Sequence, residues 1–118
     1  MALDVKRIPN LAAEYAQNHP QEIIALAIKE YAPDVAISFS GAEDVVLVDM
    51  AVKVGGKFRV FSLDTGRLHP ETYQFLEKVR ERYGIQIETF FPEPEAVQKL
   101  VQAKGLFSFF KDGHKECC

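Results

Sequence analysis

The sequence has few cysteines: two among 118 residues, and both stand at the end, as Cys117 and Cys118. It therefore has no framework of spaced cysteines such as a small secreted domain uses. It also lacks an apolar run long enough to span a bilayer, and its first ten residues lack the apolar stretch of a signal peptide. With a formal net charge of -3, it lacks the basic stripe of a general nucleic-acid binder. These absences favour a soluble, cytoplasmic protein that binds neither nucleic acid nor membrane.

Short apolar runs alternate with longer helical patterns along most of the chain. Residues 1–33 predict an N-terminal helical region, with helices at 11–17 and 21–31. Residues 34–118 predict three strands, at 35–38, 58–63 and 85–90, and three helices, at 42–54, 70–83 and 93–103. This alternation predicts an α/β fold with a parallel sheet, right-handed crossovers and helices on both sides. Ligands bind such sheets beyond the carboxyl ends of the strands, so the loops after the first two strands form the candidate site.

The first of these loops has the sequence SFSGAED and opens a helix. Ser40 and Gly41 carry little side-chain bulk, and Gly41 is free to take a positive φ. The unpaired N–H groups of the following helix would point at the same place. These features are typical of an anion-binding loop. A charged, well-capped helix start after a tight turn explains the same residues equally well, with Asp44 as a carboxylate in the first turn.

The second loop has the sequence LDTGRLHPETY and follows the next strand. Asp64 and Thr65 can form hydrogen bonds at the strand end, Gly66 permits a sharp turn, and Arg67 can hold an anionic oxygen. His69 stands just before a proline that begins a helix. An ordinary turn and helix start is the alternative. Because the two loops follow consecutive strands, we expect them to face one crevice.

The two motifs together resemble a known enzyme family. SFSGAEDVVL resembles the modified phosphate loop of the ATP-pyrophosphatase-like, or adenine nucleotide alpha hydrolase-like, superfamily, and LDTGRLHPETY resembles the sulfonucleotide reductases. Those enzymes reduce adenylylsulfate, or its 3′-phosphorylated form, to sulfite. The resemblance implies a Rossmann-like parallel sheet that is incomplete at the C-terminus of this chain. Ala42 and Val45 stand where ATP-cleaving relatives have a glycine and a hydroxyl residue, which argues against ATP hydrolysis.

The resemblance also implies which residues bind the substrate. Backbone groups of Leu63 would read the adenine edge, and the two loops would shape the rest of the nucleotide site. Because only Arg67 adds a cation to these loops, we expect the phosphosulfate to be held mainly by other parts of the enzyme. The implied substrate-binding residues are Ser38, Ser40, Gly41, Asp44, Leu63, Asp64, Thr65, Gly66 and Arg67.

The ending GHKECC resembles the first half of the [4Fe-4S] ligand set of assimilatory adenylylsulfate reductases. Cys117 and Cys118 would then be metal ligands, although four thiolates are ordinarily needed. In the family, a second cysteine pair and a nucleophilic cysteine lie farther along the chain, so no catalytic residue is expected here and a longer enzyme is predicted. His114 could support the cluster, whereas a solvent-exposed histidine is the simpler interpretation. A flexible, oxidisable terminus is the alternative for the cysteines.

The resemblance implies a thioredoxin-dependent reduction of adenylylsulfate through a cysteine thiosulfonate. Three alternatives stay open: a 3′-phosphoadenylylsulfate reductase, a nucleotide-binding module without redox chemistry, and a non-catalytic interaction domain. A homo-oligomer is also left open. The aromatic sequence LFSFF at 106–110 would be covered by further chain in a complete domain or would pack under the sheet of this one.

Overall fold

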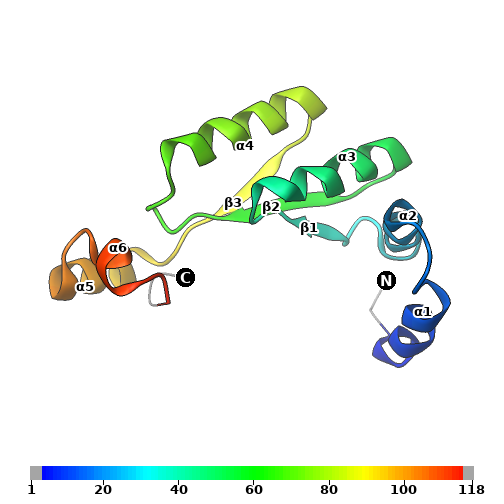
Figure 1. The fold of residues 1–118 in the computed structure, drawn as a ribbon, viewed down its shortest axis with the longest axis horizontal. Helices are drawn as coiled ribbons and strands as arrows, with labels where there is room; N and C mark the ends of the chain where they lie inside the picture. The colour runs from blue at the N-terminus through cyan, green and yellow to red at the C-terminus, as the bar shows by residue number, and fades with distance from the viewer. Residues whose placement is uncertain (1–3, 116–118) are drawn as a thin grey trace.

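A computed structural model describes residues 4–115 as helices around a small parallel sheet (Figure 1). No helix among these residues is both long enough and apolar enough to cross a bilayer. The elements in chain order are the 3-10 turn η1 (Val5–Arg7), α1 (Ile8–Glu14), α2 (Pro20–Tyr31), β1 (Ala36–Ser38), the 3-10 turn η2 (Ala42–Asp44), α3 (Val45–Val54), β2 (Arg59–Leu63), α4 (Pro70–Tyr83), β3 (Ile87–Phe90), α5 (Pro94–Lys104) and α6 (Ser108–Asp112).

The sheet has the strand order β1-β2-β3, and both pairs are parallel. Ile37 pairs with Val60, and Val60 pairs in turn with Ile87. The α/β fold and the three predicted strands are confirmed, and α3 and α4 lie within the ranges predicted for the helices between them. The carboxyl ends of β1 and β2 therefore lie at one edge of the sheet, next to the two motif loops.

Both crossover helices cover the same face of the sheet (Figure 1). The core on this face joins Val48 of α3, Val60 of β2 and Val79 of α4, with Phe39 beside them. The prediction of helices on both faces is wrong for the described residues. Two consecutive right-handed crossovers that add strands in one direction must place both helices on one side.

The opposite face of the sheet carries side chains that no described helix covers. Phe61 and Phe90 meet edge to face at 6.2 Å between ring centroids, and the Arg59 guanidinium forms two 2.8 Å hydrogen bonds to the Glu88 carboxylate. Leu63 is 64% exposed and Phe90 is 51% exposed. Such an apolar, open face is unusual for a parallel sheet, which is normally covered on both sides.

The N-terminal and C-terminal helices lie at opposite ends of the strands. Helices α1 and α2 lie towards the amino ends of the strands, whereas α5 and α6 lie beyond their carboxyl ends (Figure 1). Helix α6 was not predicted. Leu106, Phe107 and Phe110 are each about 60% exposed or more, so the LFSFF sequence does not pack under the sheet.

Candidate functional site

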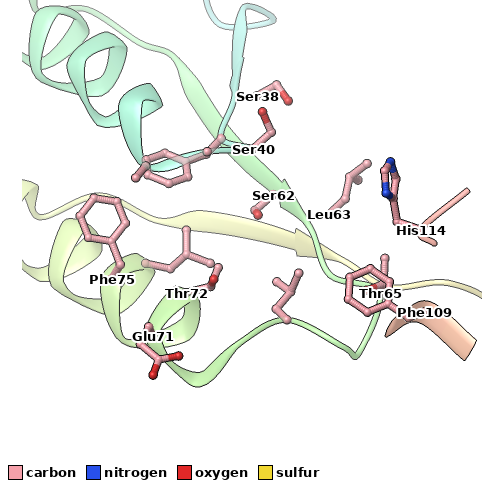
Figure 2. Close-up of a pocket in the computed structure, with 15 residues that line it drawn as sticks. Ser38, Ser40, Ser62, Leu63, Thr65, Glu71, Thr72, Phe75, Phe109 and His114 are labelled. Atoms are coloured by element: carbon pink, nitrogen blue, oxygen red, sulfur yellow. The ribbon is translucent and has the colours of Figure 1, made fainter. Parts of the chain in front are cut away.

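A cavity of about 620 Å³ lies at the carboxyl ends of β1 and β2 (Figure 2). The first loop, the end of β2 and the start of α4 form most of its wall, and Phe109 and His114 contribute from the C-terminal segment. Five of the nine predicted substrate-binding residues line it, namely Ser38, Ser40, Gly41, Leu63 and Thr65. The crevice that the sequence predicts between the two loops therefore exists.

The Asp44 side chain accepts hydrogen bonds from other residues of the first loop. Its Oδ2 accepts hydrogen bonds from the Ser40 N–H at 2.7 Å, the Gly41 N–H at 2.9 Å and the Ser40 hydroxyl at 3.0 Å. These bonds, the Ser40 backbone bond first, lower the pKa of Asp44 below its ordinary value of 3.8. Two backbone donors of the loop thus face Asp44, which itself does not line the cavity.

The structure defines the backbone of this loop more closely than the sequence does. Gly41 has φ -141° and ψ 165°, an extended conformation that needs no glycine. The helix also does not begin directly at Ala42, because residues Ala42–Asp44 form a 3-10 turn and α3 starts at Val45. The tighter turn brings the Asp44 carboxylate back to the N–H groups of Ser40 and Gly41, which satisfies donors that would otherwise be unpaired.

Some residues of the second loop line the cavity, and others lie outside its wall. Thr65 and the exposed Leu63 line the cavity, whereas Asp64 is only 7% exposed and points away from it. Asp64 Oδ1 accepts a 2.7 Å hydrogen bond from the Gly66 N–H, as in a tight turn. Arg67 bends back to its own loop, where its guanidinium donates to the Thr65 carbonyl oxygen at 3.5 Å. Asp64, Gly66 and Arg67 are therefore not in the cavity wall.

The cavity is rich in hydroxyl groups and aromatic rings but has no lysine or arginine in its described wall. Its charged or titratable side chains are Glu71 and His114. A carboxylate at the start of α4 disfavours a phosphate nearby, whereas rings and hydroxyls suit a neutral, planar group. The expectation that cations for the phosphosulfate come from elsewhere stays a prediction.

Several wall residues were missed by the sequence analysis. Ser62 is 6% exposed and lies on β2 between the first loop and α4 (Figure 2). Its side chain lines the cavity and makes no hydrogen bond within residues 4–115. Thr72 and Phe75 come from the first turns of α4, and Phe109 from α6. Strand alternation could have found Ser62, because it shares a face with the buried Val60. Phe109 gave no such signal, since α6 itself was not predicted.

Cys117 and Cys118 lie outside the described residues. Within residues 4–115, no group of three or more His, Cys, Asp and Glu side chains could hold a metal ion. Two thiolates suit an iron–sulfur cluster chemically but would provide half of the usual ligand set. His114, three residues before Cys117, lines the cavity.

Comparison with known proteins agrees with these motifs. Residues 34–118 match the family described as the phosphoadenosine phosphosulfate reductase domain. The chain is 56% identical over 111 residues to adenosine 5′-phosphosulfate reductase of Pseudomonas aeruginosa strain LESB58, covering 94% of this chain and 42% of that protein. It is 52% identical over 116 residues to 5′-adenylylsulfate reductase 1, chloroplastic, of Arabidopsis thaliana, covering 98% of this chain and 25% of that protein. The chain thus spans less than half the length of these relatives. It belongs to the phosphoadenosine phosphosulfate reductase domain family.

Proposed function

We propose that this chain is the nucleotide-holding part of an assimilatory adenylylsulfate reductase. The observation that carries the proposal is the cavity between the SFSGAED and LDTGRLHPETY loops, at the edge of a parallel sheet where nucleotides bind. The names of the two relatives, which are adenylylsulfate reductases at 52% identity or more, support adenylylsulfate as the substrate.

The proposed reaction has two steps. A cysteine thiolate from another part of the enzyme attacks the sulfur of adenylylsulfate, so that an S–S bond forms, the S–O bond breaks, and AMP leaves with the bonding electron pair. A reduced dithiol protein of the thioredoxin class then attacks the resulting thiosulfonate and releases sulfite, and its two thiols become a disulfide. Oxidation of the two thiols to the disulfide supplies the two electrons that reduce the sulfur of adenylylsulfate to sulfite, and no other reductant is needed. The reaction would take place in the cytoplasm.

The chain's own residues would hold the nucleoside. Backbone groups of Leu63 would bind the adenine edge, and the hydroxyls of Ser38, Ser40 and Thr65 would bind polar groups of the nucleotide. Asp44 would keep the first loop in shape through Ser40 and Gly41. The absence of lysine and arginine from the described cavity wall supports a site for the base and sugar, with the phosphosulfate directed outwards.

Cys117 and Cys118 would supply two thiolates to a [4Fe-4S] cluster, with two further ligands from the rest of the polypeptide. When bound, such a cluster supplies a metal centre whose charge and potential respond to nearby hydrogen bonds. His114 would be one neighbouring group. Anaerobic purification of the complete gene product should give a brown protein, and replacing both cysteines by serine should remove the colour and the iron.

Sulfite release from adenylylsulfate tests the proposed function. We expect the complete gene product to form sulfite and AMP with reduced thioredoxin, and to use 3′-phosphoadenylylsulfate at least tenfold less efficiently. The opposite preference would favour the 3′-phosphorylated substrate that the family name mentions. Magnesium-dependent ATP turnover without sulfite would instead contradict the reductase and indicate a non-redox nucleotide enzyme.

A further inference from the structure

Tyr73 connects helix α4 to the loop that follows β2 through a partly buried hydrogen bond. It lies in the first turns of α4, and its hydroxyl donates a 2.9 Å hydrogen bond to Asp64 Oδ1. Asp64 is the first residue after β2 and is 7% exposed. The helix start and the strand end are thus joined by one side-chain contact.

Asp64 also forms hydrogen bonds with its own loop and with β3. The same Oδ1 accepts the 2.7 Å hydrogen bond from the Gly66 N–H, and the Asp64 N–H donates to the Phe90 carbonyl oxygen of β3 at 2.9 Å. Three segments therefore meet at this carboxylate residue: α4, the loop after β2, and the end of β3. On the two sides of Asp64, Leu63 and Thr65 form part of the cavity wall.

Tyr73 itself does not reach the cavity. Together with Asp64 it lines a separate hollow of about 280 Å³ on the other side of Ser62, Leu68 and Leu76, which border both spaces. Burial, followed by the hydrogen bond to Asp64, raises the pKa of Tyr73 above its ordinary value of 10.0. The hydroxyl is therefore protonated at neutral pH and remains a hydrogen-bond donor.

We propose that Tyr73 is a positioning residue, which holds the loop at 64–68 so that Leu63 and Thr65 present the correct wall to an adenine nucleotide. The inference rests on the proposed function, because it assigns Tyr73 to the site that binds the nucleotide. Without the hydroxyl, Asp64 loses one of its two side-chain hydrogen bonds and the loop becomes less ordered. The loss should weaken binding of the nucleotide in the ground state and the transition state alike.

The chain provides a matched control for this test. Tyr83 lies at the other end of α4, and its hydroxyl also donates a 2.9 Å hydrogen bond to an aspartate, Asp49 Oδ1 of α3. Tyr83→Phe therefore removes the same kind of bond from the same helix, away from the cavity. A merely structural role for Tyr73 predicts that the two variants behave alike.

The experiment compares Tyr73→Phe and Tyr83→Phe in the complete gene product. We expect Tyr73→Phe to raise KM for adenylylsulfate and Kd for AMP by about three- to tenfold, the effect of one hydrogen bond, while kcat changes less than KM. Tyr83→Phe should leave both constants within about twofold, although it loses a comparable bond and a comparable part of the thermal stability.

A second pair of variants keeps the inference testable if Tyr73→Phe folds poorly. Asp64→Asn retains an oxygen that can accept both hydrogen bonds and should keep most of the AMP affinity, whereas Asp64→Leu should weaken AMP binding by a measurable factor. If Tyr73 acts through Asp64, adding Tyr73→Phe to Asp64→Leu should change Kd little further. Equal AMP affinity in the parent and Tyr73→Phe would overturn this inference alone. A parent protein that neither binds AMP nor reduces adenylylsulfate would overturn the proposed function and the inference with it.

Discussion

Asp44 determines the shape of the first loop through three hydrogen bonds to a single carboxylate oxygen. Because these bonds lower the pKa of Asp44 in the folded protein, its stabilising effect is fully present above the unfolded value near 3.8 and is lost as pH falls through the lower folded value. Asp44→Ala should therefore lower the urea midpoint of the complete gene product at pH 7. The difference from the parent should shrink towards pH 3, and a difference that is constant with pH would contradict this account.

Ser62 offers a second test at the scale of one residue. Ser62 is 6% exposed and lines the cavity, and its hydroxyl makes no hydrogen bond within residues 4–115, so in the free protein this hydroxyl adds no intramolecular hydrogen bond to the stability. Ser62→Ala should weaken AMP binding by about two- to tenfold without lowering the melting temperature. The matched control is Ser108→Ala, because Ser108 is also 6% exposed but does not line the cavity. Equal effects of both variants on AMP binding would show that Ser62 does not contact the nucleotide.

The sequence predicts individual site residues where the reason is local. Ser40, Gly41 and Thr65 were placed in the cavity wall because they stand at strand ends in a predicted parallel sheet. The direction of a side chain depends on the local turn, however. Arg67 bends back to Thr65, and Asp64 turns inward to Tyr73, and neither contact follows from residue types in the sequence.

At the scale of elements, helix ends were easier to predict than helix faces. Gly55 and Gly84 follow the last residues of α3 and α4 with positive φ, and a glycine just after a helical pattern is a common sequence sign of that ending. The first N-terminal helix lies three residues earlier than predicted, at Ile8–Glu14, with a proline in its first turn. The common face of α3 and α4 follows from strand order, which the apolar pattern does not contain.

The turn between α3 and β2 provides a prediction about how elements pack. Gly56 has φ +93°, and a Cβ added there would lie 2.7 Å from Ile28 Cγ2 of α2. Gly55 has φ +81° but open space around the same position. Gly55→Ala should cost about 1–3 kcal/mol from backbone strain, and Gly56→Ala about 1–3 kcal/mol more from the clash with α2. Urea unfolding of both variants measures the difference, and equal losses would show that α2 does not pack against this turn.

The whole molecule is more open than a compact domain of its length. Its radius of gyration is 17.5 Å, whereas a compact domain of this size is expected to have about 13.5 Å. The buried hydrophobic side chains among the described residues are few: Ile28, Phe39, Val48, Ala51, Val60 and Val79. The sequence composition does not reveal this, because the apolar residues that a core would need are present but lie on the open sheet face and in the α6 segment.

This openness predicts how the 118-residue polypeptide behaves when it is expressed alone. Leu63 and Phe90 on the open sheet face, and Phe107 and Phe110 near α6, expose apolar surface that a stable core would bury. The isolated polypeptide should bind a hydrophobic dye such as ANS and unfold over a broad range of urea, whereas the complete gene product should bind little dye and unfold cooperatively. Leu63→Ser with Phe90→Ser should reduce dye binding by the isolated polypeptide, while Val5→Ser, at an equally exposed but distant position, should not. Cooperative unfolding of the isolated polypeptide without dye binding would contradict this prediction, because it would show that the 118 residues bury this apolar surface without further chain.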